Sequence, residues 1–404
     1  MSCARRTTLR KSLVTHFQSW DQPGVGRMTV SRMDVSCVDL FCGAGGLTHG
    51  FVQEGLRVNA GIDLDPACRY PYSANNDATF VQRDISGMGA SEVAKLFRPG
   101  TIWVLAGCAP CQPFSTYSQR YETKADHKWG LLYEFARIAA GVMPDIVTME
   151  NVPAIRRHEV FDDFVKTLLE LGYEVWHDVV DCAAYGVPQS RKRMVLLASL
   201  HGPIELIEPL HDEKGYKTVR QAIGRLRPIG AGESDPRDKL HVASKLSEKN
   251  LARIRASKPG GTWRDWPRHL VAKCHRLDTG RTYPSVYGRM EWDKPAPTIT
   301  TQCYGFGNGR FGHPEQDRAI SLREAAILQG FPRSYKFVPP GEEVCFKTVG
   351  RLIGNAVPVD LGRAIAKSII RHIDQCGVNP KTSIARRRHS TRDRREAIRV
   401  GGAM

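Results

Sequence analysis

Short apolar runs alternate with amphipathic stretches through the first half of the chain. Runs rich in Val and Ile are typical of buried strands, whereas apolar residues repeating every three or four positions are typical of helices. The pattern predicts helices at residues 46–54 and 131–142, and strands at residues 35–41, 58–63, 79–85, 102–106 and 146–151. Strands that alternate with helices form a doubly wound, mostly parallel sheet covered on both faces. We therefore predict an α/β fold.

Two more apolar runs, at residues 174–180 and 194–200, extend this sheet. A short Gly186-Val187-Pro188 turn lies between them, where a parallel connection would need a crossover helix. The sheet is therefore predicted to end in an antiparallel pair.

The pattern changes after residue 205. Pro, Gly, Arg and Trp are frequent from there to about residue 344, without a sustained period, which predicts an irregular second domain. Glycines that let a backbone approach closely, together with stacking aromatics and arginines, suit a nucleic-acid surface, although many glycine-rich segments are only loops. Helical periodicity returns at residues 322–328 and 361–370.

The charge balance favours a polyanionic partner. The 404 residues carry a formal net charge of +16, of which residues 1–35 supply +4 and residues 379–404 supply +6. Such a balance is typical of nucleic-acid binding, although the last segment could equally be a solvated tail. No apolar run reaches the roughly 18 residues of a membrane span, and no apolar core follows the first basic residues as in a secretory signal. We expect a cytoplasmic, nucleoid-associated protein.

The eleven cysteines lack the paired spacing of a disulfide framework, which indicates a reducing compartment. Cys108 and Cys111 form the one C-x-x-C motif, and no second pair completes a zinc site. We expect no metal.

A glycine-rich turn follows the first predicted strand, at residues 39–47. Its glycines would let backbone amides approach an adenosine-bearing ligand at a helix N-terminus. Asp63 ends the second strand about 20 residues later, where an acid can accept from both ribose hydroxyls. Asp84 lies at the end of the third. Capping of the following helices is the alternative role for these acids. The G-x-G-G pattern disfavours a nicotinamide dinucleotide without excluding it.

Cys111 lies between Pro110 and Pro113, directly after a predicted strand. The prolines exclude a continuous helix, so Cys111 must lie on a turn at the end of the sheet, where α/β enzymes place reactive groups. We interpret it as a nucleophilic thiolate. A small buried apolar residue, or a redox pair with Cys108, are the alternatives.

Six motifs, in order, resemble those of the DNA (cytosine-5) methyltransferases that use S-adenosylmethionine. They are residues 39–46, Pro110-Cys111-Gln112, Glu150-Asn151-Val152, residues 189–193, residues 323–332, and Gly354-Asn355-Ala356-Val357-Pro358. The chain departs from the family at Cys108-Ala109, since members usually have Gly-Pro or Pro-Pro before the nucleophile.

The resemblance implies a Rossmann-like class I methyltransferase and a role for each catalytic residue. Cys111 would add to carbon 6 of a cytosine that has left the duplex stack, and Glu150 would supply a proton at ring nitrogen 3. Arg193 and Arg191 would lie beside the adduct. The polar stretch 115–128 would close over the base.

The resemblance also implies the methyl-donor site and the domain boundaries. Residues 34–205 with 345–376 would form the catalytic domain, residues 206–344 an inserted target-recognition domain carrying the threonine-rich residues 298–301, and residues 1–33 and 377–404 a basic arm and tail. The implied S-adenosylmethionine ligands are Phe41, Gly43, Ala44, Gly45, Asp63, Leu64, Asp84, Ile85, Pro110, Leu132, Asn355 and Ala356.

Duplex DNA is the expected partner, because the predicted recognition domain is large and arginine-rich. A tRNA cytosine-5 methyltransferase of the same fold is the alternative, followed by a catalytically silent DNA-binding relative and a redox enzyme. We expect a monomer. The recognised bases and a companion restriction endonuclease are left open by the sequence.

Overall fold

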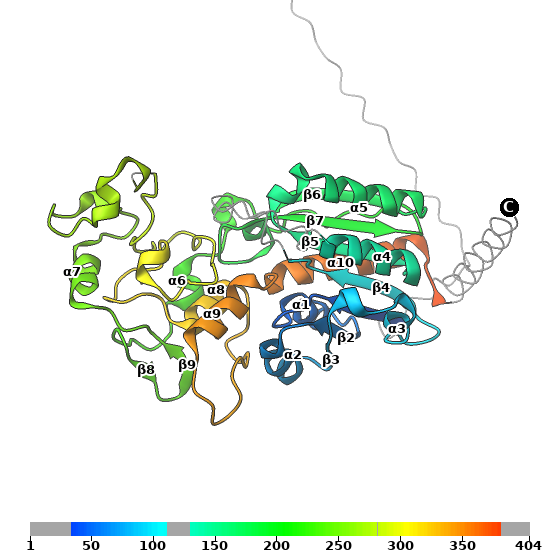
Figure 1. Cartoon of the computed structure of the whole chain (residues 1–404), viewed down its shortest axis with the longest axis horizontal. Helices are drawn as coiled ribbons and strands as arrows, with labels where there is room; N and C mark the ends of the chain where they lie inside the picture. Colours follow the sequence, from blue (N-terminus) through cyan, green and yellow to red (C-terminus); the bar gives the residue numbers. More distant parts are fainter. Residues whose placement is uncertain (1–33, 111–129, 281, 381–404) are drawn as a thin grey trace, which may run out of the picture.

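A computed structural model of the chain describes residues 34–110, 130–280 and 282–380. Seven strands form one sheet in the order β3-β2-β1-β4-β5-β7-β6 (Figure 1). These strands are β1 (Val35–Leu40), β2 (Val58–Asp63), β3 (Thr79–Gln82), β4 (Ile102–Gly107), β5 (Ile146–Asn151), β6 (Glu174–Asp181) and β7 (Lys192–Ser199). The first five are parallel, and β7 runs antiparallel to both β5 and β6. The predicted α/β class and the antiparallel end of the sheet are confirmed.

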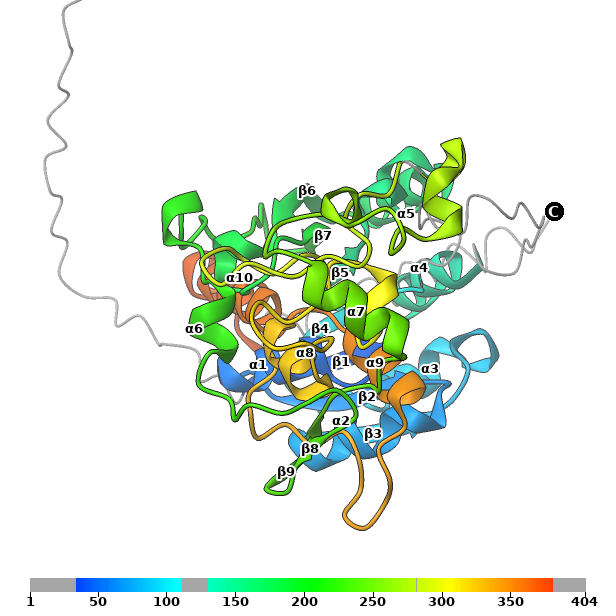
Figure 2. The same cartoon turned by 90° about the vertical axis from the view of Figure 1, so that its left-hand side faces the viewer.

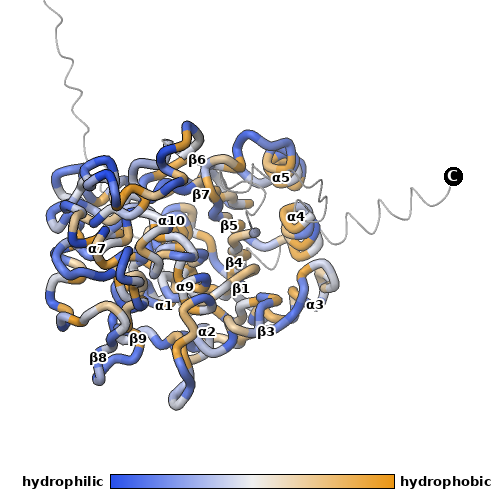
Figure 3. Tube along the Cα trace, turned by 60° about the vertical axis from the view of Figure 1, so that its left-hand side comes forward, coloured by the Kyte–Doolittle hydropathy of each residue, from blue (hydrophilic) through white to orange (hydrophobic). Residues whose placement is uncertain are grey.

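Helices cover both faces of this sheet, because alternate strand residues point to opposite sides. Val38, Leu105 and Met149 pack with α4 and α5, whereas Cys37 and Val104 pack with α1 and α10. Figure 2 shows the two helical layers on either side of the strands, and Figure 3 shows hydrophobic residues concentrated along β1, β4 and β5. The helices are α1 (Gly46–Gln53), α2 (Arg69–Asn75), α3 (Ala90–Ala94), α4 (Gly130–Val142), α5 (Glu159–Glu170), α6 (Val219–Ile223), α7 (Glu248–Ala256), α8 (Leu322–Leu328), α9 (Phe346–Asn355) and α10 (Val359–Cys376).

The last helix packs against the first. Gly50 of α1 has no room for a side chain, since a Cβ there would lie 2.6 Å from the Val359 carbonyl oxygen and 2.7 Å from the Arg363 amide nitrogen. α10 begins after Pro358 and is capped at its end by Gly377, which takes a left-handed φ of 59°. The close approach places the Gly354–Pro358 turn, far along the chain, beside the glycine-rich turn after β1.

Residues 206–344 are largely irregular, as predicted. Besides α6, α7 and α8, the segment holds the short pair β8 (Ser234–Asp235) and β9 (Asp238–Val242). Many of its apolar side chains share a buried cluster with α9 and with Tyr72 of α2, while Trp263 and Trp266 belong to a separate cluster within the segment. The segment therefore packs against the N-terminal unit through a common core. No helix of the described ranges is long and apolar enough to cross a membrane.

A buried ion pair holds the start of α8. The Arg318 guanidinium donates two hydrogen bonds of 2.7 Å to the two carboxylate oxygens of Glu324, and both side chains are only 1% exposed. Arg323 donates to both oxygens of Asp238, at 2.6 and 3.0 Å. The Arg323-Glu324 motif therefore joins α8 to the irregular segment.

His313 makes this region sensitive to acid. Burial lowers the pKa of His313 to about 4, and its Nδ1 already accepts from the backbone amides of Glu315 and Gln316. For Glu324, desolvation opposes ionisation, but the bonds and charge of Arg318 outweigh it and lower the pKa to about 2.

Both pKa shifts predict that the free energy of unfolding decreases as the pH is lowered. The unfolded chain protonates His313 near its ordinary pKa of 6.5, while the folded chain resists until about 4. We expect a loss of about 2–3 kcal/mol between pH 7 and 4.5, and a further loss below 4.5 as Glu324 is protonated. Urea unfolding at each pH measures it. His313→Gln should remove the first loss, and an unchanged decline in that variant would contradict the assignment.

Candidate active site

A cavity of about 750 Å³ opens at the carboxyl ends of β1, β2, β4 and β5. Cys111 and the stretch 115–128 lie outside the described residues. The predicted site residues that line the cavity are Phe41, Gly43, Ala44, Asp63, Leu64, Asp84, Ile85, Pro110, Glu150, Arg191, Arg193, Asn355 and Ala356.

The turn after β1 presents open backbone to this cavity. Phe41 and Gly43 have left-handed φ values of 56° and 55°, a strained conformation for the non-glycine residue. A Cβ built on Gly43 would meet no atom within 4 Å, so its backbone faces free space. A ligand can therefore approach the main chain closely at this point.

Asp63 is fixed at the rim of the same turn. Its carboxylate accepts hydrogen bonds of 2.9 Å from the Gly43 and Asp65 amides, and burial raises its pKa. The neighbouring Leu64 is 63% exposed although it is apolar, which fits a side chain that covers a bound ligand. Asp84 lies just after β3 and caps a short turn by accepting from the Ser86 amide at 3.0 Å, so the capping alternative also describes it.

Two of the predicted donor ligands do not line the cavity. Gly45 has a φ of 88°, and a Cβ there would lie 2.8 Å from Asn76 Nδ2, so this glycine serves the turn and its packing. Leu132 is only 4% exposed and packs in the core. Its helical neighbours Leu131 and Glu134, on the other face of α4, line the cavity instead.

Glu150 lies at the end of β5 and is 3% exposed. The Cys108 thiol donates to its Oε2 at 2.8 Å. Arg193 Nε lies 2.8 Å from Oε1, but no described residue donates an aligned hydrogen bond to this atom. Oε1 is therefore a buried polar atom that a ligand can satisfy.

Arg191 lies in the wall of the cavity and also joins distant segments of the chain. Its guanidinium donates to the carbonyls of Ile299, at 2.8 Å, and Gly354, at 3.1 Å, and burial lowers its pKa to about 9. These bonds join the irregular segment to the last residues of α9.

Asn151 and Gln189 have roles that sequence reasoning missed, although both lie within recognised motifs. Asn151 Nδ2 donates to the Ala109 carbonyl at 3.1 Å, and so holds the backbone two residues before Cys111. Gln189 is fully buried, donates to Gln329 Oε1 at 2.8 Å and accepts from the Ile299 amide at 2.8 Å. Residues 298–301 are therefore bound to the 189–191 segment.

An ion pair between Arg351 of α9 and Asp65 was also missed. Both residues line the cavity, but 286 positions separate them in the chain. No local signal predicts such a contact.

The Cys108 thiol donates to the Glu150 carboxyl, and its removal tests whether this bond positions Glu150. A single hydrogen bond contributes about 0.5–1.5 kcal/mol. We expect Cys108→Ala to lower the turnover rate about 10-fold, because Glu150 loses the donor that orients it. Cys108→Ser keeps a donor and should restore most of the rate. Steady-state kinetics, with KM for the methyl donor as the control, measure both variants; equal losses in Ala and Ser would contradict the positioning role.

Comparison with known proteins identifies the family. Residues 35–371 match the family described as C-5 cytosine-specific DNA methylase. The type II methylase M.HgiDII of Herpetosiphon aurantiacus is 55% identical over 340 residues, 83% of this chain and 95% of that protein. The type II methyltransferase M1.HphI of Haemophilus parahaemolyticus is 31% identical over 84% of this chain and 87% of its own length.

Solved structures agree at the level of the fold. The crystal structure of the Dnmt2 methyltransferase of S. pombe superimposes with a TM-score of 0.54 at 17% identity, over 85% of this chain and 99% of that one. The matched region contains the whole cavity described above. The chain belongs to the C-5 cytosine-specific DNA methylases, and its activity is the transfer of a methyl group to carbon 5 of cytosine in DNA.

Proposed function

We propose that the chain methylates a cytosine flipped out of duplex DNA within a short specific sequence, using S-adenosylmethionine and a covalent bond from Cys111. The observation that carries the proposal is the buried Glu150, whose Oε1 lacks an aligned hydrogen-bond donor among the described residues. Next to it, Asn151 holds the Ala109 carbonyl and Pro110 lines the cavity, which supports a catalytic role for Cys111, the next residue in the sequence.

The cavity fits S-adenosylmethionine as methyl donor. Its volume of about 750 Å³ is within the range of small-molecule sites. Asp63 would hold the ribose, Phe41 and Ile85 would flank the adenine, Leu64 would cover it, and Gly43 would admit the methionine end. The bound donor supplies an electrophilic methyl group on sulfur.

Carbon 5 of cytosine is a weak nucleophile, and the residues of the proposed site would activate it. Attack of the Cys111 thiolate forms a bond to carbon 6, and the electrons of the 5,6 double bond then make carbon 5 nucleophilic. Glu150 supplies a proton to nitrogen 3 as charge builds on the ring. Arg193, beside Glu150, would hold the base. Carbon 5 would take the methyl group as the bond between that methyl and the donor sulfur breaks. A base, such as water, would then remove the carbon 5 proton, which expels the thiolate and restores the ring.

Residues 206–344 would recognise the sequence around the target. A base inside a duplex cannot present carbon 6 to a thiolate, so the nucleotide must leave the stack. The irregular segment would read base edges while phosphate contacts set the register. We further propose that the chain acts as a monomer, that it needs no metal, and that it is associated with the nucleoid.

One experiment tests substrate and sequence together. DNA and tRNA from a strain without other cytosine methylation, with and without this chain, are sequenced after bisulfite treatment. We expect one short DNA motif to remain unconverted at a single cytosine. Unconverted cytosines in tRNA alone would favour the alternative substrate, and complete conversion of both would contradict the proposal.

A further inference from the structure

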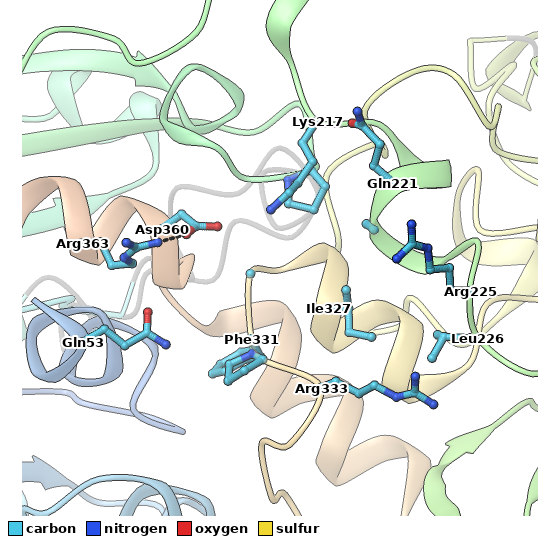
Figure 4. A pocket seen from close by; sticks show the side chains of 14 residues that line it. Gln53, Lys217, Gln221, Arg225, Leu226, Ile327, Phe331, Arg333, Asp360 and Arg363 are labelled. Carbon is cyan, nitrogen blue, oxygen red and sulfur yellow. Dashed lines mark hydrogen bonds and ion pairs between the residues drawn. The ribbon is translucent and has the colours of Figure 1, made fainter.

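A basic groove lies outside the catalytic cavity. One cavity of about 380 Å³ opens between α1, α6, the end of α8 and the start of α10, where Lys217, Arg225, Arg333 and Arg363 surround Ile327 and Phe331 (Figure 4). A second, of about 480 Å³, adjoins β8 and β9. The two share Arg225 and Arg333 in their walls, so they lie side by side, and together we call them the basic groove.

The acids of this groove are already paired. Asp238 binds Arg323 through two hydrogen bonds, Asp360 binds Arg363 at 3.2 Å, and Asp235 lies 3.9 Å from Arg227. The lining holds seven Lys and Arg against three Asp, which leaves an excess of four positive charges.

Three guanidiniums supply most of that excess. Arg225, Arg237 and Arg333 are exposed, and none has an ion pair with another described residue. Unpaired arginines along one groove are available to an external anion.

The methyl-transfer site does not account for this groove. The walls of the basic groove share no residue with those of the cavity that contains Glu150. α1 and α10, which border the groove, cover one face of the sheet, whereas α4, which borders the catalytic cavity, covers the other (Figure 2).

The charged side chains that line the basic groove suit a ligand with several successive phosphate groups. Arginine forks bind phosphate oxygens in pairs, and the second cavity is lined almost wholly by charged side chains, unlike the apolar pockets that enclose a base or a drug-sized ligand. DNA is the substrate of this family and carries such a row. We infer that the basic groove binds the backbone of a second DNA segment, apart from the one that holds the target cytosine.

This inference rests on the proposed function in one respect, namely that the chain binds DNA. Bound at the groove, a second segment would be held without regard to its sequence, because phosphate contacts carry no base information. Its affinity would fall steeply with salt.

A capture experiment tests the groove in the full chain. The protein is bound to an immobilised short duplex with its target, and a labelled non-target duplex is added. The wild type should capture the second duplex. Arg225→Gln combined with Arg237→Gln and Arg333→Gln should lose most of the capture and lower the salt slope of non-target binding by about 2–3, since each phosphate contact contributes about 0.9. Affinity for S-adenosylmethionine should stay unchanged, which reports that the variant is folded, and capture is expressed per protein retained on the target duplex.

A charge-matched variant separates the groove from net charge. Arg156, Arg220 and Arg255 are exposed arginines off the groove, each in an ion pair with an aspartate. Their combined replacement by Gln removes the same charge and should leave capture near the wild-type level.

Equal capture by the groove variant and the wild type, or equal losses in both variants, would overturn the inference. Groove-dependent binding of polyglutamate in preference to DNA would also overturn it and assign the surface to an acidic protein. Capture without methylation by the wild type would instead contradict the proposed function alone.

Discussion

Replacement of Cys111 by alanine is expected to abolish methyl transfer, with a fall in rate of about 10⁴-fold or more. Without the sulfur, carbon 5 of cytosine never gains the electron density it needs to attack the donor. Just before Cys111 in the sequence, the Ala109 carbonyl is held by Asn151 and Pro110 lines the cavity. Binding of DNA and of S-adenosylmethionine should persist. Single-turnover transfer of a labelled methyl group measures the loss.

Covalent trapping distinguishes a nucleophile from a merely structural cysteine. A duplex with 5-fluorocytosine at the target cannot lose a proton from carbon 5, so the wild type should form a complex that survives denaturation. Cys111→Ala should form none. Cys345→Ser is the matched control, because Cys345 is an exposed cysteine outside the cavity. Substantial activity or trapping in Cys111→Ala would contradict the covalent mechanism.

Glu150→Gln is expected to lower the rate of methyl transfer by about 10²–10⁴-fold. Glutamine has the shape of the buried acid and can remain beside Arg193, but it has no carboxyl proton to transfer to nitrogen 3. The loss should therefore appear in the rate of the chemical step, while affinity for DNA and for the donor changes little.

A second acid in the same cavity provides the control. Glu134 also lines the cavity, from α4, at a place that suits donor binding. Glu134→Gln should act on KM for the donor and leave the single-turnover rate within about 10-fold of the wild type. A Glu150→Gln enzyme with a near-normal rate would show that another group protonates the base.

The strands of the sheet were predictable because their signal is local. Runs such as residues 58–63 and 146–151 are apolar on both faces of a buried parallel strand, and both predicted ranges match the observed ones. The third strand was predicted too long: it ends at Gln82, because the Asp84 side chain caps a new turn. Residues at strand ends, such as Asp63 and Glu150, followed from this pattern and from the motifs.

Side-chain direction was less predictable. Adjacent positions on a helix differ by about 100°, so a motif alignment placed Leu132 in the cavity although Leu131 is the residue that lines it. Arg191 belongs to the right motif, but which partner its guanidinium chooses depends on the Ile299 and Gly354 carbonyls, which are distant in the chain.

The amino-acid order by itself determined the α/β class, the antiparallel end of the sheet and the family, since each depends on neighbours within a few positions or on a recognisable motif. Only the tertiary structure decided the Arg351–Asp65 pair, the Cys108 bond to Glu150, and the basic groove. These features join side chains from segments far apart in the chain, and their energies depend on distance and burial after folding, which no local pattern encodes.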